Sequence, residues 1–261
     1  MSEWSEFDTA YDLPPFPGTP RTYLVATTQR TGSHYLAYLL ACDGSLGAPF
    51  EYVNGHRVFL ELERRGWPQG EQSEVRLLEE VIQRRTGPSG WFGVKSHWHT
   101  WAAIQSKPAI RSRVAPQRVI YLSREDLTAQ AVSLAMAEIT GEWVNVGHRA
   151  TSPADFDRAR VEDALRRIEV ERAAWEAFLG RWPGEVLRLR YEDLIASPDV
   201  AVDEVFGYLG AARAPKQRSL TPLRPTPDDL LEGWVAQFRR TRVAEESQMS
   251  AGESRLGAAT S

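Results

Sequence analysis

The feature that most constrains the fold is a short apolar run followed directly by a glycine turn and a helical stretch. Residues Thr22 to Thr27 are β-branched or apolar, which is typical of a buried strand. The turn Arg30-Thr-Gly-Ser33 follows, and the apolar run from Tyr35 to Ala41 has the length and composition of a helix. The chain therefore opens with a strand, a tight turn and a helix.

The same alternation continues along the chain. Three more strands are expected at Trp91 to Val94, Arg118 to Leu122 and Glu185 to Leu189. Helical patterns separate and follow them, at Arg57 to Arg65, Glu74 to Arg85, Thr128 to Ile139, Phe156 to Trp182 and Val200 to Leu209. Strands that alternate with helices predict an α/β fold, a three-layer sandwich around a central, mainly parallel sheet.

The domain organisation follows from composition. With 261 residues, the chain fits one large domain or two small ones. We expect an irregular, proline-rich arm at 1–21, one domain at 22–244, and a small, polar, disordered tail at 245–261. A basic and then proline-rich segment at 213–229 is expected to form an ordered flap.

Charge and cysteine content exclude several classes of protein. The 31 Lys and Arg against 35 Asp and Glu give a net charge of −4, so we expect no nucleic-acid partner, although a local basic pocket remains allowed. The single cysteine, Cys42, excludes an intramolecular disulfide and is expected to be a small buried residue. No run approaches the roughly 18 apolar residues of a membrane span, and no targeting segment is visible. These features predict a cytoplasmic protein without a membrane partner.

The turn after the first strand has the residues of a phosphate-binding loop. Gly32 permits a tight turn, after which the backbone amides point at one centre at the helix N-terminus, where an anion is favoured. Thr31 and Ser33 add hydroxyl donors, and Arg30 adds a forked cation. An ordinary strand-to-helix turn is the alternative. The run Gly-x4-Gly-Lys-Ser/Thr is absent, which argues against a kinase or ATPase.

A second anion site is predicted after the strand at Arg118 to Leu122. Arg124 follows that strand, and Ser133 lies nine residues later in the next helix. An arginine beside a serine hydroxyl can hold a phosphate monoester. The alternative is a surface arginine and a buried helical serine. Two such sites in one chain favour a ligand with two separate anionic groups.

Five short motifs follow one another in a fixed order: Gln29-Arg-Thr-Gly-Ser-His34, Gly47-Ala-Pro-Phe-Glu51-Tyr52, Gly93-Val-Lys-Ser-His-Trp98, Arg124-Glu-Asp126 with Gln130-Ala-Val-Ser133, and Tyr191-Glu-Asp-Leu194. Together they resemble the sulfotransferases that use 3′-phosphoadenylyl sulfate (PAPS). They are most similar to the bacterial carbohydrate sulfotransferases of the trehalose 2-sulfotransferase type. The resemblance spans about Thr22 to Arg240.

This resemblance implies a P-loop-like sulfotransferase fold, PAPS as the donor co-substrate and no metal. It implies that the donor's 5′-phosphosulfate binds the loop Arg30, Thr31, Gly32, Ser33 and His34, and that Arg124 and Ser133 bind its 3′-phosphate. His34 stands where the family usually has threonine, at the place expected to meet the sulfuryl group, and its charge is expected to depend on pH.

The catalytic residues implied by the resemblance are Glu51 as the base, with Arg30 and His34. Apolar neighbours, Phe50 and Tyr52, can raise the pKa of a carboxyl toward neutrality. A solvated loop glutamate is the alternative, and His34 and His99 are rival bases. His97 and His99 have no cysteine or carboxylate at metal spacing, so no metal site is expected.

The acceptor is expected to meet polar and aromatic side chains near the strand ends, namely Gln29, Glu51, Tyr52, Lys95 and Trp98. Three cations of the proline-rich segment, Lys216, Arg218 and Arg224, either cap the nucleotide or belong to a solvated loop.

The leading hypothesis is a sulfotransferase that acts on a hydroxyl of a small acceptor, a carbohydrate or a glycosylated metabolite. The alternatives are another P-loop-like nucleotide-binding enzyme, such as a kinase, and a non-catalytic relative that only binds the nucleotide. A homodimer is also expected, because dimers are known in the family.

Overall fold

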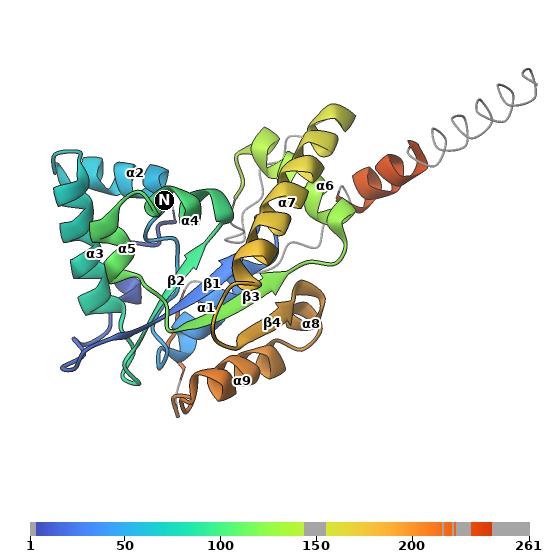
Figure 1. The fold of residues 1–261 in the computed structure, drawn as a ribbon. Coiled ribbons are helices and arrows are strands. Elements are labelled where there is room, and N and C mark those ends of the chain that lie inside the picture. The colour runs from blue at the N-terminus through green and yellow to red at the C-terminus, as the bar shows by residue number, and fades with distance from the viewer. Residues whose placement is uncertain (1–3, 144–154, 216, 221, 223–230, 242–261) are drawn as a thin grey trace, which may run out of the picture.

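Within the residues that the structure describes, four strands form one parallel sheet at the centre of the molecule (Figure 1). The strands are β1 (Arg21–Thr27), β2 (Trp91–Ser96), β3 (Arg118–Ser123) and β4 (Val186–Arg190), in the order β2-β1-β3-β4. The structure is a computed structural model that describes residues 4–143, 155–215, 217–220, 222 and 231–241. The predicted α/β fold with a parallel sheet is confirmed.

Helices make the connections between the strands. They are α1 (Ser33–Asp43), α2 (Gly55–Arg65), α3 (Glu71–Arg85), α4 (Trp98–Ile104), α5 (Pro108–Arg113), α6 (Leu127–Thr140), α7 (Arg158–Leu179), α8 (Tyr191–Ala196) and α9 (Pro198–Leu209), and the segment 231–241 is also helical. The sequence predicted all the long helices of this set except the last. It missed α4, α5 and α8, because elements of six or seven residues are too short to show a helical period.

Alternation along the strands creates two separate cores. In β1, Leu24 and Ala26 pack into one apolar cluster with α2, α3, α4 and α7. Tyr23 and Val25 point to the opposite face and pack with α1, α8 and α9. Because side chains alternate across a strand, each face of the sheet is covered by its own helical layer. A third cluster joins α6 and α7 to the helix at 231–241.

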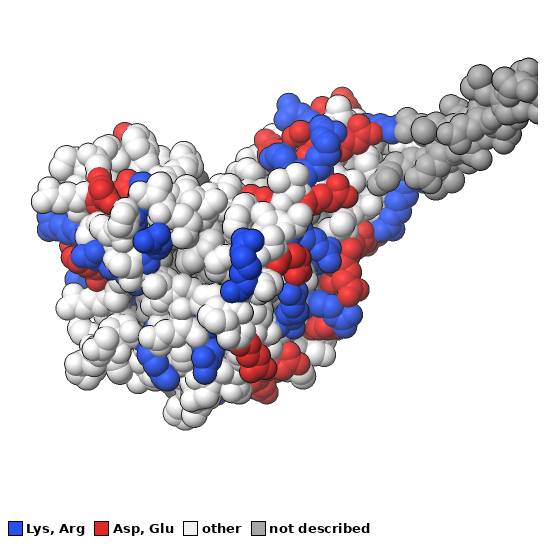
Figure 2. All heavy atoms as spheres, viewed as in Figure 1, with Lys and Arg blue, Asp and Glu red and all other residues white. Residues whose placement is uncertain are grey.

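The strand order creates a crevice between the ends of β1 and β3. The chain leaves β1 toward β2 on one side and leaves β3 toward β4 on the other, so the loops that follow these two strands diverge. Figure 2 shows the viewed surface hollowed between the helices α2 to α5 and the helices α6 and α7, with Lys and Arg interspersed among Asp and Glu. Ligands of open α/β sheets bind in such a crevice.

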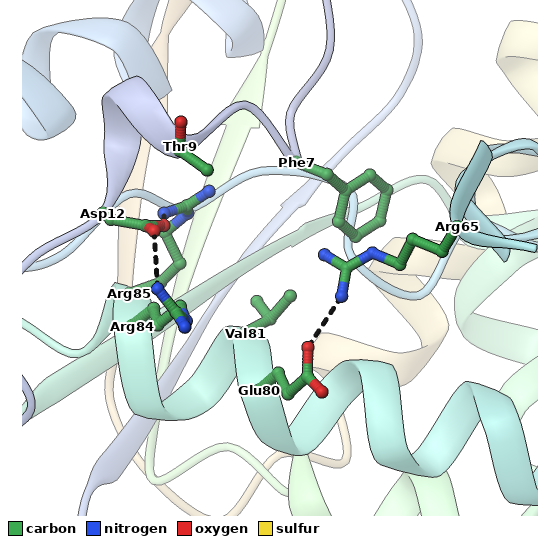
Figure 3. A pocket seen from close by; sticks show the side chains of 8 residues that line it. All are labelled: Phe7, Thr9, Asp12, Arg65, Glu80, Val81, Arg84 and Arg85. Atoms are coloured by element: carbon green, nitrogen blue, oxygen red, sulfur yellow. Dashed lines mark hydrogen bonds and ion pairs between the residues drawn. The ribbon is translucent and has the colours of Figure 1, made fainter. Parts of the chain in front are cut away.

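The N-terminal arm packs closely against the domain that begins at residue 22. Its only regular element among the described residues is a 3-10 turn, Thr9–Tyr11. Phe7 and Tyr11 are buried in the sheet's main cluster. Asp12 pairs with Arg84 and Arg85 of α3 beside a cavity between arm and helix (Figure 3). The arm packs against the domain because burying the apolar rings of Phe7 and Tyr11 in the core removes them from water.

In the described part of the proline-rich segment, Arg218 has contacts other than those predicted. Arg218 donates to the carbonyls of Ala10 and Asp12, so it fastens the arm, and the prediction that it caps a nucleotide is wrong. Lys216, Arg224 and the tail at 245–261 lie outside the described residues. Cys42 is buried, as predicted. No helix in the described ranges is long and apolar enough to cross a bilayer.

Trp175 of α7 is the side chain that fastens this helix to the sheet. It is fully buried, it packs edge-on against Trp98, and its indole N–H donates to the carbonyl of Thr27 at 2.8 Å. We expect Trp175→Ala to lower the free energy of unfolding by about 3–5 kcal/mol, measured by urea denaturation. Val170→Ala, on the exposed side of the same helix, should change it by less than about 0.5 kcal/mol. Equal effects of the two substitutions would contradict this assignment.

Candidate functional site

The loop between β1 and α1 has a constrained backbone. Gly32 has a φ of 74°, and Arg30 has a φ of 63° and is the one non-glycine residue with positive φ in the described part of the chain. A Cβ atom on Gly32 would lie 2.9 Å from the ring of Tyr191, so the predicted need for glycine is explained both by conformation and by contact. A non-glycine residue in this region costs about 1–3 kcal/mol and is characteristic of functional sites.

Buried hydrogen bonds hold this loop in shape. The Thr31 hydroxyl lies 2.5 Å from that of Thr27 and also donates to the carbonyl of Thr28. From α6, the amide of Gln130 donates to the hydroxyl of Thr28 and to the carbonyl of Gln29. The side chain of Thr31 therefore serves the loop itself, in contrast to the predicted role as a ligand donor.

The loop leads into the N-terminus of α1, an eleven-residue helix that begins at Ser33. Gly32 is the N-cap and offers no side-chain acceptor to the first amides. The first N–H groups of a helix have no partner inside the helix, and the helix dipole favours a negative charge there. This end of the helix can therefore receive an anionic group, as the sequence predicted.

Beside the loop lies a group that we call the arginine pocket: Arg30, Arg124, Ser133 and Tyr191. Arg30 Nε donates to Ser133 Oγ at 2.9 Å, and one of its terminal nitrogens donates to the carbonyl of Trp143. Arg124 donates to the carbonyl of Arg30 at 3.3 Å and lies 4.2 Å above the Tyr191 ring. Arg30 thus contacts both predicted residues, Arg124 through its backbone carbonyl and Ser133 through its side chain.

The arginine pocket holds two like charges, and the carboxylates of Asp126 and Glu192 act on Arg124 only from beyond ion-pair distance. Burial, and then the charge of Arg124, lower the pKa of Arg30 to about 10. Burial likewise lowers the pKa of Arg124, whose Nε is buried without a hydrogen-bond partner. Among the described residues neither guanidinium pairs with Asp or Glu. Buried charges are normally paired, so this pocket is suited to an anionic ligand.

The second group, which we call the Lys95 cluster, consists of Lys95, Glu51, His34, Ser33 and His97. Lys95 lies on β2 two residues after Gly93, so it points to the face that α1 covers. It is fully buried, and its ammonium donates to Glu51 Oε1 at 2.5 Å, to His34 Nδ1 at 3.1 Å and to Ser33 Oγ at 3.4 Å. All three N–H donors of the ammonium therefore have partners.

Glu51 reaches Lys95 because its loop runs along β2. The carbonyl of Phe50 accepts a hydrogen bond from the backbone of Lys95, which places the next side chain beside the ammonium. The other carboxylate oxygen of Glu51 accepts from the amide of Asn54 at 2.7 Å and lies 3.8 Å from His97 Nδ1. Glu51 is therefore held as a buried, hydrogen-bonded carboxylate.

The charge state of the cluster differs from the sequence-based expectation. Burial acts to raise the pKa of Glu51, but the attraction of Lys95 outweighs it and holds the pKa well below the usual range. Burial and then Lys95 lower the pKa of His34 well below its ordinary value, so His34 is neutral at physiological pH. Burial also lowers the pKa of His97 to about 4. The predictions of a raised pKa for Glu51 and of a pH-dependent charge on His34 are therefore wrong.

Three predicted residues lie in other surroundings. Tyr52 is buried, stacks on Phe92 and donates its hydroxyl to a backbone carbonyl, so it has no free face for an acceptor. Trp98 is partly buried against Trp175. His99 is bound to Glu171 of α7 at 2.6 Å, a contact that raises its pKa. We leave Tyr52 out of the acceptor site for this reason.

Two neighbours of these groups carried no predicted role. Asn54 caps α2 through its side-chain oxygen while its amide holds Glu51. An asparagine directly before a helical run is a typical N-cap, so its place was detectable, but its contact with Glu51 was not. Tyr191, part of the last motif, separates Gly32 from Arg124.

Comparison with known proteins places the chain among sulfotransferases. The family model described as Stf0 sulphotransferase matches residues 22–241. A trehalose 2-sulfotransferase of Mycobacterium tuberculosis (strain ATCC 35801 / TMC 107 / Erdman) is 24% identical over 258 residues, covering 84% of this chain and 94% of that protein. Nodulation protein H of Rhizobium tropici is 24% identical over 208 residues, covering 74% and 77%.

A solved sulfotransferase from Alicyclobacillus acidocaldarius covers 85% of this chain and 92% of its own, with 14% identity and a TM-score of 0.46. The α/β assignment itself rests on the parallel strand order described above.

The Lys95–Glu51 pair yields a prediction for stability. Lys95→Met leaves a buried carboxylate unpaired, so we expect a loss of about 3–5 kcal/mol in the free energy of unfolding at pH 7. Without Lys95, burial raises the folded-state pKa of Glu51 above its unfolded value, so the deficit should shrink as the pH falls and Glu51 takes up a proton. Urea denaturation at pH 7 and pH 5 measures both effects.

Lys107→Met is the matched control, because Lys107 forms a half-exposed ion pair with Glu74 at 2.6 Å. It should lose less than about 1 kcal/mol. A deficit for Lys95→Met that is the same at both pH values would contradict the coupling to Glu51.

Proposed function

Since the chain belongs to the Stf0 sulphotransferase family, we propose that it transfers a sulfuryl group from PAPS to a hydroxyl of a small carbohydrate acceptor. The single observation that carries the choice of donor is the arginine pocket, with two partly buried guanidiniums that form no ion pair with a carboxylate in the described chain. A nucleotide with a phosphate at each of two positions supplies the missing anions.

The two anion sites are close enough for one nucleotide. Gly32, at the start of α1, and Arg124, in the arginine pocket, both adjoin the ring of Tyr191. In our proposal the amides at the α1 N-terminus and Ser33 receive the 5′-phosphosulfate. Arg124, Ser133 and Arg30 receive the 3′-phosphate. Arg30 therefore moves from the predicted catalytic group to the pocket that holds the donor, because its guanidinium contacts Ser133.

The reaction requires the acceptor oxygen to attack sulfur in line with the leaving phosphate. The new bond joins the acceptor oxygen to sulfur, and the bond between sulfur and the 5′-phosphate oxygen breaks. The acceptor proton passes to the Glu51 carboxylate, and the electron pair leaves with adenosine 3′,5′-bisphosphate. The helix N-terminus stabilises the charge that develops on the leaving phosphate.

Lys95 and His34 are suited to the transferred group. Lys95 offers an ammonium to Ser33, His34 and Glu51 at once, so a small rotation of its side chain can redirect one donor toward a sulfuryl oxygen. Lys95 lies within reach of both ring nitrogens of His34, and whichever nitrogen carries the proton of the neutral ring can donate it. His34 can thus take over the donor role of the usual threonine hydroxyl.

A carboxylate with a low pKa is a weak base, yet it suffices for this reaction. In a loose, phosphoryl-like transition state the acceptor keeps its proton until bonding to sulfur has advanced. By then the attacking oxygen has become acidic, and a hydrogen-bonded carboxylate such as Glu51 can accept the proton. Redirecting Lys95 toward the donor also removes the charge that holds the pKa of Glu51 low.

The acceptor class rests on the relatives and on the residues near Glu51. One relative is named as a trehalose 2-sulfotransferase, which favours a sugar hydroxyl for this chain also. Gln29, Lys95 and Trp98 remain proposed acceptor contacts together with Glu51. The homodimer and the cytoplasmic location stay predictions.

Binding of adenosine 3′,5′-bisphosphate tests the donor site. Isothermal titration should show a specific complex with the wild-type protein, and Arg124→Gln should weaken it about 30-fold, since a charge-assisted hydrogen bond contributes about 2 kcal/mol. Arg188→Gln is the control, because Arg188 forms an exposed ion pair with Glu176 on β4 and α7. Absence of binding to the wild-type protein at millimolar nucleotide would contradict the proposal.

Glu51→Gln tests the base. Turnover with labelled PAPS should fall at least about 100-fold, because proton removal by a positioned base contributes about that much. The nucleotide affinity should stay within twofold of wild type. Glu61→Gln is the matched control: Glu61 is equally buried and paired with two arginines of α2, but it lies outside the Lys95 cluster. Wild-type turnover in Glu51→Gln would remove Glu51 from the mechanism.

A further inference from the structure

The N-terminal arm touches the Lys95 cluster. The ring of Trp4 lies edge-on to that of His34, with centroids 5.4 Å apart, and edge-on to Phe50 at 5.6 Å. Its indole N–H donates to the hydroxyl of Tyr11 at 2.9 Å. The family match begins at residue 22, so these contacts come from a part of the chain that the family model does not include.

Other residues of the arm hold Trp4 in its position against His34. Phe7 packs on Tyr52 with ring centroids 5.9 Å apart, and Tyr11 packs on Phe50 at 4.8 Å. Beyond these rings, Asp12 is fastened to Arg84 and Arg85, as Figure 3 shows. Trp4 therefore lies against His34 as part of the packed structure.

His34 is the member of the cluster that faces solvent. Its side chain is 25% exposed, whereas those of Glu51 and His97 are 8% exposed and that of Lys95 is fully buried. His34 Nε2 lies 3.7 Å from Glu51 Oε1, so an acceptor at Glu51 lies beside His34. Because Trp4 packs against His34, its ring borders that position.

The arm also brings a carboxyl group to the same region. Glu6 is buried, and Arg57 of α2 lies 3.8 Å from it. Glu6 acts electrostatically on both Lys95 and Glu51. Glu6 is too buried to touch an acceptor, so the partly buried indole of Trp4 is the group of the arm that suits a sugar, whose ring has apolar faces and polar edges.

We propose that the N-terminal arm forms one wall of the acceptor site, in which Trp4 contacts the ring of a mono- or disaccharide beside His34 and so determines acceptor affinity. This inference rests on the proposed function. It extends the acceptor site beyond the residues that match the family and replaces Tyr52, which is buried, with an aromatic residue from the arm.

The test is the kinetics of Trp4 variants with PAPS and a panel of glucose, maltose and trehalose, using the sugar that the wild-type protein sulfates fastest. Trp4→Ala should raise the acceptor KM about tenfold, as expected for loss of an aromatic contact. The kcat and the affinity for adenosine 3′,5′-bisphosphate should stay within twofold. Trp4→Phe keeps an aromatic ring and should retain most of the acceptor affinity. This variant also tests the contact with the acceptor if Trp4→Ala does not fold.

Trp67→Ala is the control, because Trp67 also packs on the main core cluster but contacts Arg65 and Arg76 away from the Lys95 cluster. Its acceptor KM should match wild type. If the wild-type protein is active and Trp4→Ala leaves its acceptor KM unchanged, the proposal that Trp4 contacts the acceptor is wrong. An equal rise of the acceptor KM in Trp67→Ala would also overturn it. A wild-type protein that sulfates no sugar of the panel overturns the carbohydrate part of the proposed function, and the wall with it.

Discussion

The site depends first on the buried ion pair between Lys95 and Glu51. Burying a charged ammonium or carboxylate without a partner is costly, because each loses its hydration. Here Lys95 donates to Glu51, His34 and Ser33, while Glu51 accepts from Asn54 as well. These bonds tie β2, the loop before α2 and the start of α1 to one point, so the reacting groups are positioned before any substrate arrives.

The arginine pocket presents the opposite situation. Arg30 and Arg124 are partly buried, no carboxylate among the described residues forms an ion pair with them, and Arg30 adds a strained backbone to their repulsion. The protein therefore carries charge repulsion and backbone strain where an anion is to bind, and the bound anion offsets the repulsion. The Lys95 cluster thus positions the reacting groups through its own ion pair. The arginine pocket needs a bound anion to balance its charge.

This contrast also explains how much the sequence could predict. The strands and long helices follow from local periodicity, and the β1 loop with Arg124 follows from the rule that ligands bind at strand ends. The pKa of Glu51 could not be predicted, because the charge that decides it comes from Lys95, 44 residues away. The burial of Tyr52 depends on its ring contacts with Phe7 and Phe92. The contacts of Arg30 with Arg124 and Ser133 depend on its backbone and side-chain conformation. Each miss concerns a contact between distant segments, about which local patterns carry no information.

The histidine at position 34 and the arm are best understood together. A histidine next to a buried lysine would add a second positive charge if it were protonated, and burial, together with Lys95, prevents that by lowering its pKa. The ring can therefore replace a threonine hydroxyl as a neutral donor. It is also larger than a threonine side chain, and it reaches the surface of the cluster, where it needs a neighbour. Trp4 packs edge-on against that ring from outside the family match, so residue 34 and the arm together shape the acceptor side of the site that we propose.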